Sequence, residues 1–177
     1  MRPAPEGETA FRLRAEQLAA TDDGPGALLH YEGPFGPMAV ETYGKITKTH
    51  LTGGSVGRAE VDWGWWTREI LFKQGVSHKD RLREGVEARV GDVRLRLHQP
   101  NRGAFRQRRV LAVERPDSPA VFRLRRWEAL SMERDDGEVL MRLPSGDEGM
   151  VRSADAIDVA VFLLVHASHL RRELEFG

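Results

Sequence analysis

Residues 153–165 read Ser-Ala-Asp-Ala-Ile-Asp-Val-Ala-Val-Phe-Leu-Leu-Val, an apolar run that opens on polar residues. Ser153 is a suitable helix N-cap, and Asp155 and Asp158 would lie near the positive end of the helix dipole. With two arginines marking the last turn, the sequence predicts a helix over about Ser153–Leu174. Its middle is apolar almost all round, which on a soluble chain indicates burial on most sides. The rest of the chain must therefore wrap around this helix or cover both of its flanks.

The chain before the helix consists of short stretches that alternate apolar with polar residues and are separated by turn residues. The clearest hairpin joins Val86–Val90 to Val93–His98 through Gly91-Asp92. Lys48–Gly57 is rich in Gly and Thr and is predicted to be a loop. The other predicted strands are Ala27–Glu32, Met38–Ile46, Arg58–Trp66, Arg68–Gln74, Phe105–Glu114, Ala120–Trp127, Ala129–Arg134, Glu138–Leu143 and Gly149–Val151.

This pattern of short alternating stretches separated by turns predicts a mainly β (α+β) fold. We expect an antiparallel β-barrel or barrel-like meander, with a sandwich as the alternative, and the apolar C-terminal helix packed in or against it. Glu6–Ala20 is rich in Ala, Glu, Arg and Leu and is predicted to be a short amphipathic helix. Residues 1–26 would then be an N-terminal helical extension and linker, and residues 27–177 a single β-rich domain with the C-terminal helix.

Composition excludes several classes of protein. The 177 residues are 40% hydrophobic and 31% charged, a balance typical of one folded domain. No cysteine is present, which excludes disulfides, thiolate metal sites and cysteine nucleophiles. The N-terminus lacks the apolar region of a secretory signal, and the apolar stretch Ala156–Val165 is too short to span a bilayer. We therefore expect a cytoplasmic protein with no transmembrane segment.

The middle of the chain is basic although the net charge is zero. Between Lys79 and Arg126, 14 Lys or Arg stand against 6 Asp or Glu, a local excess of +8. Phosphate-bearing ligands, either nucleic acid or anionic lipid, would bind an arginine-rich strand face. Its candidate residues are Arg94, Arg96, Arg106, Arg108, Arg109, Arg123, Arg125 and Arg126. Solvated strand faces with alternating charge, together with a coding bias toward Arg, account for the same pattern without any ligand.

Three of the four tryptophans fall within Trp63-Gly-Trp65-Trp66. Trp65 and Trp66, if exposed, would anchor a partner protein or stack on a ligand. The alternative is that Trp63 and Trp65 belong to the core and Trp66 packs under a loop.

Residues that could carry catalysis are sparse. Glu60 and Asp62 would project from the same strand face and, with His98, are the best candidates for a small β-barrel enzyme. No third ligand lies at a suitable spacing, so no metal site is predicted. The sequence has no phosphate-binding loop and no serine-hydrolase, zinc-protease or kinase signature. We therefore expect no cofactor and favour a non-catalytic protein.

Several patterns together carry a resemblance to a known family. They are the short strands with alternating Arg, a Trp127-Glu strand followed by Asp135-Asp-Gly-Glu138, and a final apolar helix introduced by Asp155. Over roughly Ala27–Leu174 the layout resembles bacterial members of the tubby C-terminal-like superfamily, which includes LURP-one-related and phospholipid-scramblase-like proteins. The resemblance implies a closed barrel threaded by a hydrophobic C-terminal helix. It also implies that a basic barrel face, here the arginines between Arg94 and Arg126, binds anionic lipid headgroups or protein partners.

The leading functional hypothesis is a non-catalytic binding or accessory protein that presents a β-surface to a macromolecular partner, above all a protein. Recognition of phosphate-bearing ligands by the arginine face is the first alternative. A small β-barrel enzyme is the second. The sequence leaves the oligomeric state open.

Overall fold

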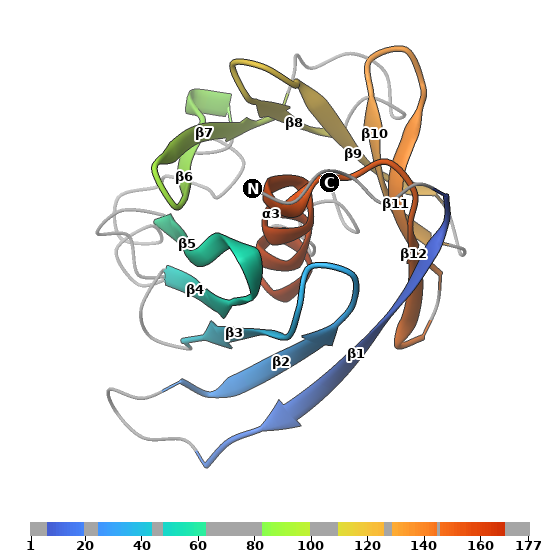
Figure 1. Cartoon of the computed structure of the whole chain (residues 1–177). Helices are drawn as coiled ribbons and strands as arrows, with labels where there is room; N and C mark the ends of the chain where they lie inside the picture. The colour runs from blue at the N-terminus through green and yellow to red at the C-terminus, as the bar shows by residue number, and fades with distance from the viewer. Residues whose placement is uncertain are drawn as a thin grey trace.

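The computed structural model describes residues 7–19, 25–43, 48–62, 83–99, 110–125, 129–144 and 146–168. In these residues twelve strands close into a barrel around the helix α3 (Ala156–Ala167) (Figure 1). The strands are β1 (Thr9–Gln17), β2 (Ala27–Glu32), β3 (Met38–Thr42), β4 (Lys48–Gly53), β5 (Gly57–Asp62), β6 (Val86–Val90), β7 (Val93–His98), β8 (Val110–Glu114), β9 (Ala120–Arg125), β10 (Ala129–Arg134), β11 (Val139–Pro144) and β12 (Glu148–Val151).

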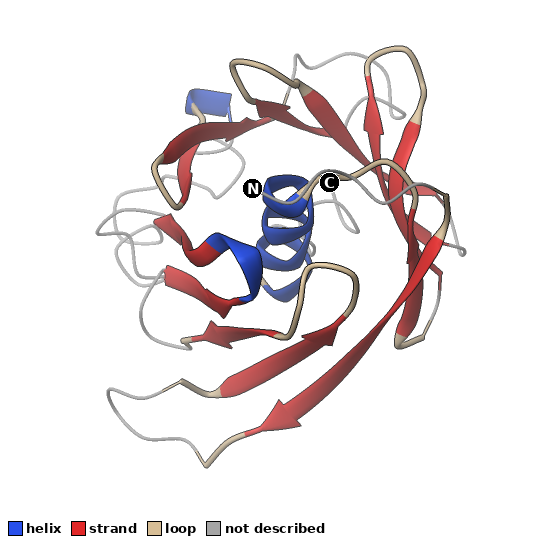
Figure 2. Cartoon of the chain, viewed as in Figure 1, coloured by secondary structure: helices blue, strands red, loops and turns tan. Residues whose placement is uncertain are grey.

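The strands follow one another around the barrel in the order of the sequence. Each pairs antiparallel with its neighbours, and β1 pairs with β12 to close the ring (Figure 2). Closure removes the unpaired edges that an open sheet would expose. The predicted fold class is therefore confirmed, and the helix is packed in the barrel rather than against its outside.

The helix begins and ends differently from the prediction. Its N-cap is Asp155, whose Oδ1 accepts hydrogen bonds from the backbone N–H groups of Ile157 and Asp158, both at 2.9 Å. Asp158 completes a capping box by accepting from the backbone N–H of Asp155 at 3.1 Å. The expected N-cap Ser153 is wrong, because a carboxylate that serves two N–H groups lies two residues further on. No helix among the described residues is both long and apolar enough to cross a membrane.

At its other end the helix stops well before the expected Leu174. Ser168 has extended backbone angles, with φ −93° and ψ 174°, and its N–H donates to the carbonyls of Leu164 and Val165. Its hydroxyl also donates to the Val165 carbonyl at 3.1 Å. These bonds satisfy the carbonyls of Leu164 and Val165, and the extended backbone of Ser168 ends the helix.

The core lies between α3 and the inner face of the barrel. Every residue from Ala156 to Val165 is buried, as the apolar run predicted. Phe162 packs in the middle, with its ring centroid 6.4 Å from that of Phe11 on β1 and 5.8 Å from that of Phe122 on β9. The interior is thus filled by side chains of the helix and the strands.

The helix predicted over Glu6–Ala20 is wrong, since Thr9–Gln17 forms β1. Phe11 and Leu13 are buried on alternate positions, a period of two rather than 3.6. Pairing with both β2 and β12 satisfies the backbone of this segment and overrides its helical propensity. The segment predicted to be an extension therefore belongs to the barrel, which begins at Thr9.

The hairpin of Val86–Val90 and Val93–His98 has the predicted boundaries, and Gly91 takes a positive φ of 56° in its turn. The loop predicted at Lys48–Gly57 is wrong, because β4 and the short 3-10 helix η1 (Gly54–Val56) occupy it. Thr49 and Leu51 are buried on alternate positions there, although Gly and Thr conceal the pattern. The predicted strand Arg68–Gln74 lies outside the described residues.

Candidate functional site

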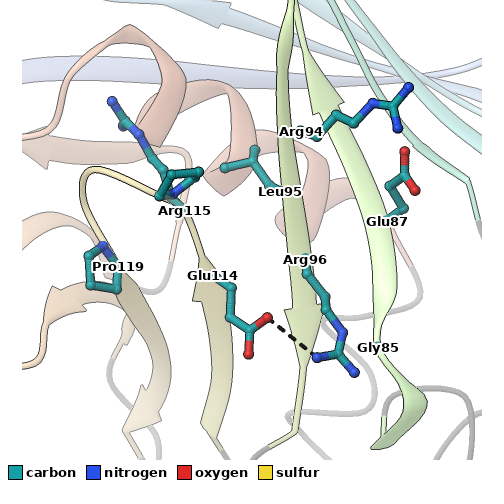
Figure 3. A pocket seen from close by; sticks show the side chains of 9 residues that line it. Gly85, Glu87, Arg94, Leu95, Arg96, Glu114, Arg115 and Pro119 are labelled. Carbon is teal, nitrogen blue, oxygen red and sulfur yellow. Dashed lines mark hydrogen bonds and ion pairs between the residues drawn. The ribbon is translucent and has the colours of Figure 1, made fainter.

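A cleft of about 620 Å³ opens between β7 and the turn that follows β8 (Figure 3). Its floor and walls combine an apolar part with charged residues from three strands. The lining residues are Gly85, Glu87, Arg94, Leu95, Arg96, Glu114, Arg115, Pro116 and Pro119. Because α3 fills the barrel, this cleft at the barrel wall is the best candidate for a binding site among the described residues.

The cleft exists because β7 and β8 separate early. They are in register over three pairs, beginning with Arg96 opposite Glu114 and running toward His98. If the ladder continued the other way, Arg94 would meet Pro116. Proline has no N–H and cannot donate to a ladder, so the pairing stops at this point. The strands part there, and the cleft fills the gap.

Arg96 fastens one wall of the cleft. Its guanidinium donates to the carbonyl of Glu84 and lies 3.4 Å from Oε2 of Glu114, as the dashed line in Figure 3 marks. Gly85, with φ +93°, leaves the space that this side chain needs, because a Cβ there would overlap Nε of Arg96. Nδ1 of His98 also lies 3.4 Å from Oε1 of Glu114. Glu114 therefore stands between two basic groups.

The back of the cleft is an ionic cluster that joins the barrel to the helix, in which Arg115 and Asp158 are buried, Asp155 is half-buried and Asp117 is exposed. Arg115, whose side chain is 4% exposed, donates from Nη2 to Asp155 at 2.7 Å and from Nη1 to Asp158 at 3.1 Å. Its Nε donates to Asp117 at 2.7 Å. One guanidinium thus neutralises part of the charge of three carboxylates, two of which form the cap of α3.

The cluster shifts the pKa values of its members in opposite directions. Burial, reinforced by the charge of Asp155, raises the pKa of Asp158 to about 6. Burial also acts against the ionised form of Asp155, but hydrogen bonds from Arg115 and from backbone N–H groups lower its pKa below the ordinary value. Although burial opposes it, hydrogen bonding to Asp155 and Asp117 raises the pKa of Arg115, which stays charged.

These shifts predict a pH dependence of stability. Asp158 has a higher pKa folded than unfolded, so the folded protein binds more protons. Its contribution to stability is present below the unfolded pKa of 3.8 and is lost as the pH rises through about 6. Relative to Asp158→Asn, the wild type should lose on the order of 2 kcal/mol between about pH 4 and pH 7. Urea unfolding of both proteins across this pH range measures the loss. A difference in unfolding free energy that stays constant with pH would contradict the prediction.

Of the arginines that the sequence grouped into one face, three have described side chains, and all three are exposed. Arg94 and Arg96 line the cleft, but Arg123 on β9 forms an ion pair with Glu133 at 3.0 Å. Of Arg125 only the backbone is described. The other candidates of that group, Arg106, Arg108, Arg109 and Arg126, and the aromatic candidates Trp65 and Trp66 lie outside the described residues.

The candidate catalytic residues whose side chains the structure describes, Glu60 and His98, do not lie together. Glu60 lies on β5, 3.5 Å from Arg58 and 3.9 Å from Nε2 of His50, whereas His98 is at the far end of β7 beside Glu114. The side chain of Asp62 lies outside the described part of the chain. No group of three His, Asp or Glu within the described residues has the geometry to hold a metal ion.

The sequence patterns identify Arg94 and Arg96 of the cleft but neither Arg115 nor Pro116. They relate the carboxylates at the start of the helix only to the helix dipole. The available signal was a Pro two positions after a strand, which marks the end of a ladder. Comparison with known proteins adds nothing to this geometry, because no family model, curated protein or solved structure matches the chain.

Proposed function

We propose that this protein is a non-catalytic binding protein that presents the outside of its barrel to a partner protein. The observation that carries the proposal is the filled interior. The continuous buried stretch Ala156–Val165 occupies the space in which a barrel of this kind would hold an internal ligand. A ligand or partner would therefore bind at the outer wall of the barrel. The cleft beside β7 has an apolar floor and a charged rim.

Membership of the tubby C-terminal-like superfamily, in its bacterial LURP-one-related or phospholipid-scramblase-like branch, is part of the same proposal. A closed twelve-stranded barrel with an apolar C-terminal helix at its centre supports it. So does the cap residue Asp155, which introduces that helix as the resemblance requires. A cytoplasmic location belongs to the proposal as well.

Cross-linking of the tagged full-length chain in lysate of the source cells tests the function. The expected result is a defined protein, identified by mass spectrometry, that cross-links in stoichiometric amount and is competed by untagged chain. A chain that stays monomeric without a cross-linked protein, while the purified chain turns over a substrate, would refute the proposal.

Recognition of phosphate-bearing ligands is the second candidate, favoured by one observation. Arg89 and Arg94 stand directly opposite each other on β6 and β7. Like charges in that position repel each other, and an anion between them would relieve the repulsion. Binding to DNA, RNA and anionic vesicles at low salt tests it, and it should weaken steeply as salt is added.

A further inference from the structure

The backbone of β7 is bare where it borders the cleft. In the tight hairpin, Val90 and Val93 flank the turn and bond to each other, and the direction of backbone groups then alternates along the strand. The N–H and C=O groups of Arg94 and Arg96 therefore point away from β6, toward β8. Arg96 has Glu114 as its partner there, whereas Arg94 has no paired residue on that side among the described residues. An extended chain could complete the ladder at Arg94.

Two cations beside this bare backbone, Arg89 and Arg94, have no ion-pair partner among the residues that the structure describes, and the carboxylate of Glu87 lies next to Arg94 in the cleft (Figure 3). Glu60, which lies opposite Arg89 on β5, is directed to Arg58 at 3.5 Å instead. The Arg89–Arg94 pair is thus a cationic site on the outer face, next to the backbone that lacks a partner.

The inner side of the same cleft is apolar. Leu95, 4% exposed, forms its floor, and the exposed rings of Pro116 and Pro119 form the opposite wall. Its volume of about 620 Å³ lies within the range of about 300–1,000 Å³ that ligand pockets occupy. An acceptable occupant therefore needs an apolar group directed inward and an anionic group directed outward.

We propose that an acidic, extended segment of the partner protein binds in this cleft by pairing with the backbone of Arg94. Residues paired across a ladder share a face, so the residue opposite Arg94 is acidic and meets Arg94 and Arg89. The next residue points to the other face and places an apolar side chain between Leu95 and the two prolines. This inference rests on the proposed function and specifies which surface serves it and what sequence the partner carries.

Fluorescence polarisation with labelled peptides tests the segment chemistry. The acidic probe is Gly-Glu-Leu-Glu-Val-Glu-Leu-Gly, and its basic counterpart carries Lys in place of each Glu. The wild type should bind the acidic probe and not the basic one. Arg94→Glu should weaken the affinity for the acidic probe at least about tenfold, because it places like charges together. It should also allow the basic probe to bind.

The matched control is Arg142→Glu on β11, which exchanges an exposed arginine elsewhere on the barrel (Figure 1). It should leave the affinity for the acidic probe unchanged. Pro119→Glu is the second variant. It leaves Arg94 in place and should also weaken the affinity for the acidic probe. Equal losses in Arg94→Glu and Arg142→Glu would mean unspecific charge attraction and would overturn the inference.

Two further measurements report on the backbone pairing. The amide proton of Arg94 should exchange rapidly in the free protein and become protected when the acidic probe is bound. A probe with N-methyl groups on the amides of its Glu residues, which face β7 in this pairing, should lose binding, because it cannot complete a ladder. No protection at Arg94, or equal affinity of the methylated probe, would refute backbone pairing.

The experiments separate this inference from the proposed function. If a cross-linked partner is captured equally by wild type and Arg94→Glu, and the acidic probe does not bind, the binding function stands and the cleft is not its site. If anionic vesicles or nucleic acid bind in an Arg94-dependent manner while the peptide does not, the cationic site serves phosphate ligands and the inference is wrong.

Discussion

Replacing Arg115 by Met is expected to lower the free energy of unfolding by about 3–5 kcal/mol. The substitution keeps an apolar stem of similar length but leaves the buried Asp158 and the half-buried Asp155 without their cation. Two carboxylates at the start of α3 would then repel each other, one of them in a setting that water barely reaches. Urea unfolding at pH 7, followed by tryptophan fluorescence and far-UV circular dichroism, measures the loss.

The control for this prediction removes the opposing charge as well. Asp158→Asn retains an oxygen that can accept the capping hydrogen bond from Asp155, so it removes charge and little else. Combined with Arg115→Met, it should recover part of the lost stability, with a coupling of about 1–3 kcal/mol in a double-mutant cycle. A loss below about 0.5 kcal/mol for Arg115→Met, or strict additivity, would show that the cluster does not tie the helix to the barrel.

The global fold was predictable because its evidence is local. The apolar run Ala156–Val165 demands enclosure wherever it is placed, and the turn Gly91-Asp92 fixes a hairpin with strands on either side. β1 was mistaken because its composition favours a helix, and only the neighbours β2 and β12 make the extended form better. Propensity is a weak guide when a barrel needs one more strand to close.

The candidate site was beyond sequence reasoning because it depends on distant residues meeting. Arg115 reaches Asp155 over 40 positions of the chain, and no spacing rule connects them. The gap beside Arg94 likewise requires the register that sets Pro116 against it. The sequence shows the arginine pattern, but it does not show which of these arginines lack an ion-pair partner. Arg96 and Arg123 are paired with glutamates, and Arg94 is distinguished only by the strands around it.

Phe162→Ala should lower the free energy of unfolding by about 3–5 kcal/mol, because it opens a cavity where the helix packs against two separate strands of the barrel, β1 and β9. Phe162 is fully buried and its ring packs between those of Phe11 and Phe122, so neither side can collapse inward without moving a strand. Phe162→Leu, which keeps most of the apolar volume, is the graded control and should lose less. Since the helix and the strands share one hydrophobic core, fluorescence and circular dichroism should report one cooperative transition in urea for both variants. If the helix unfolds while the strand signal is retained, the barrel is stable without α3. The buried helix would then no longer be an argument against an internal ligand.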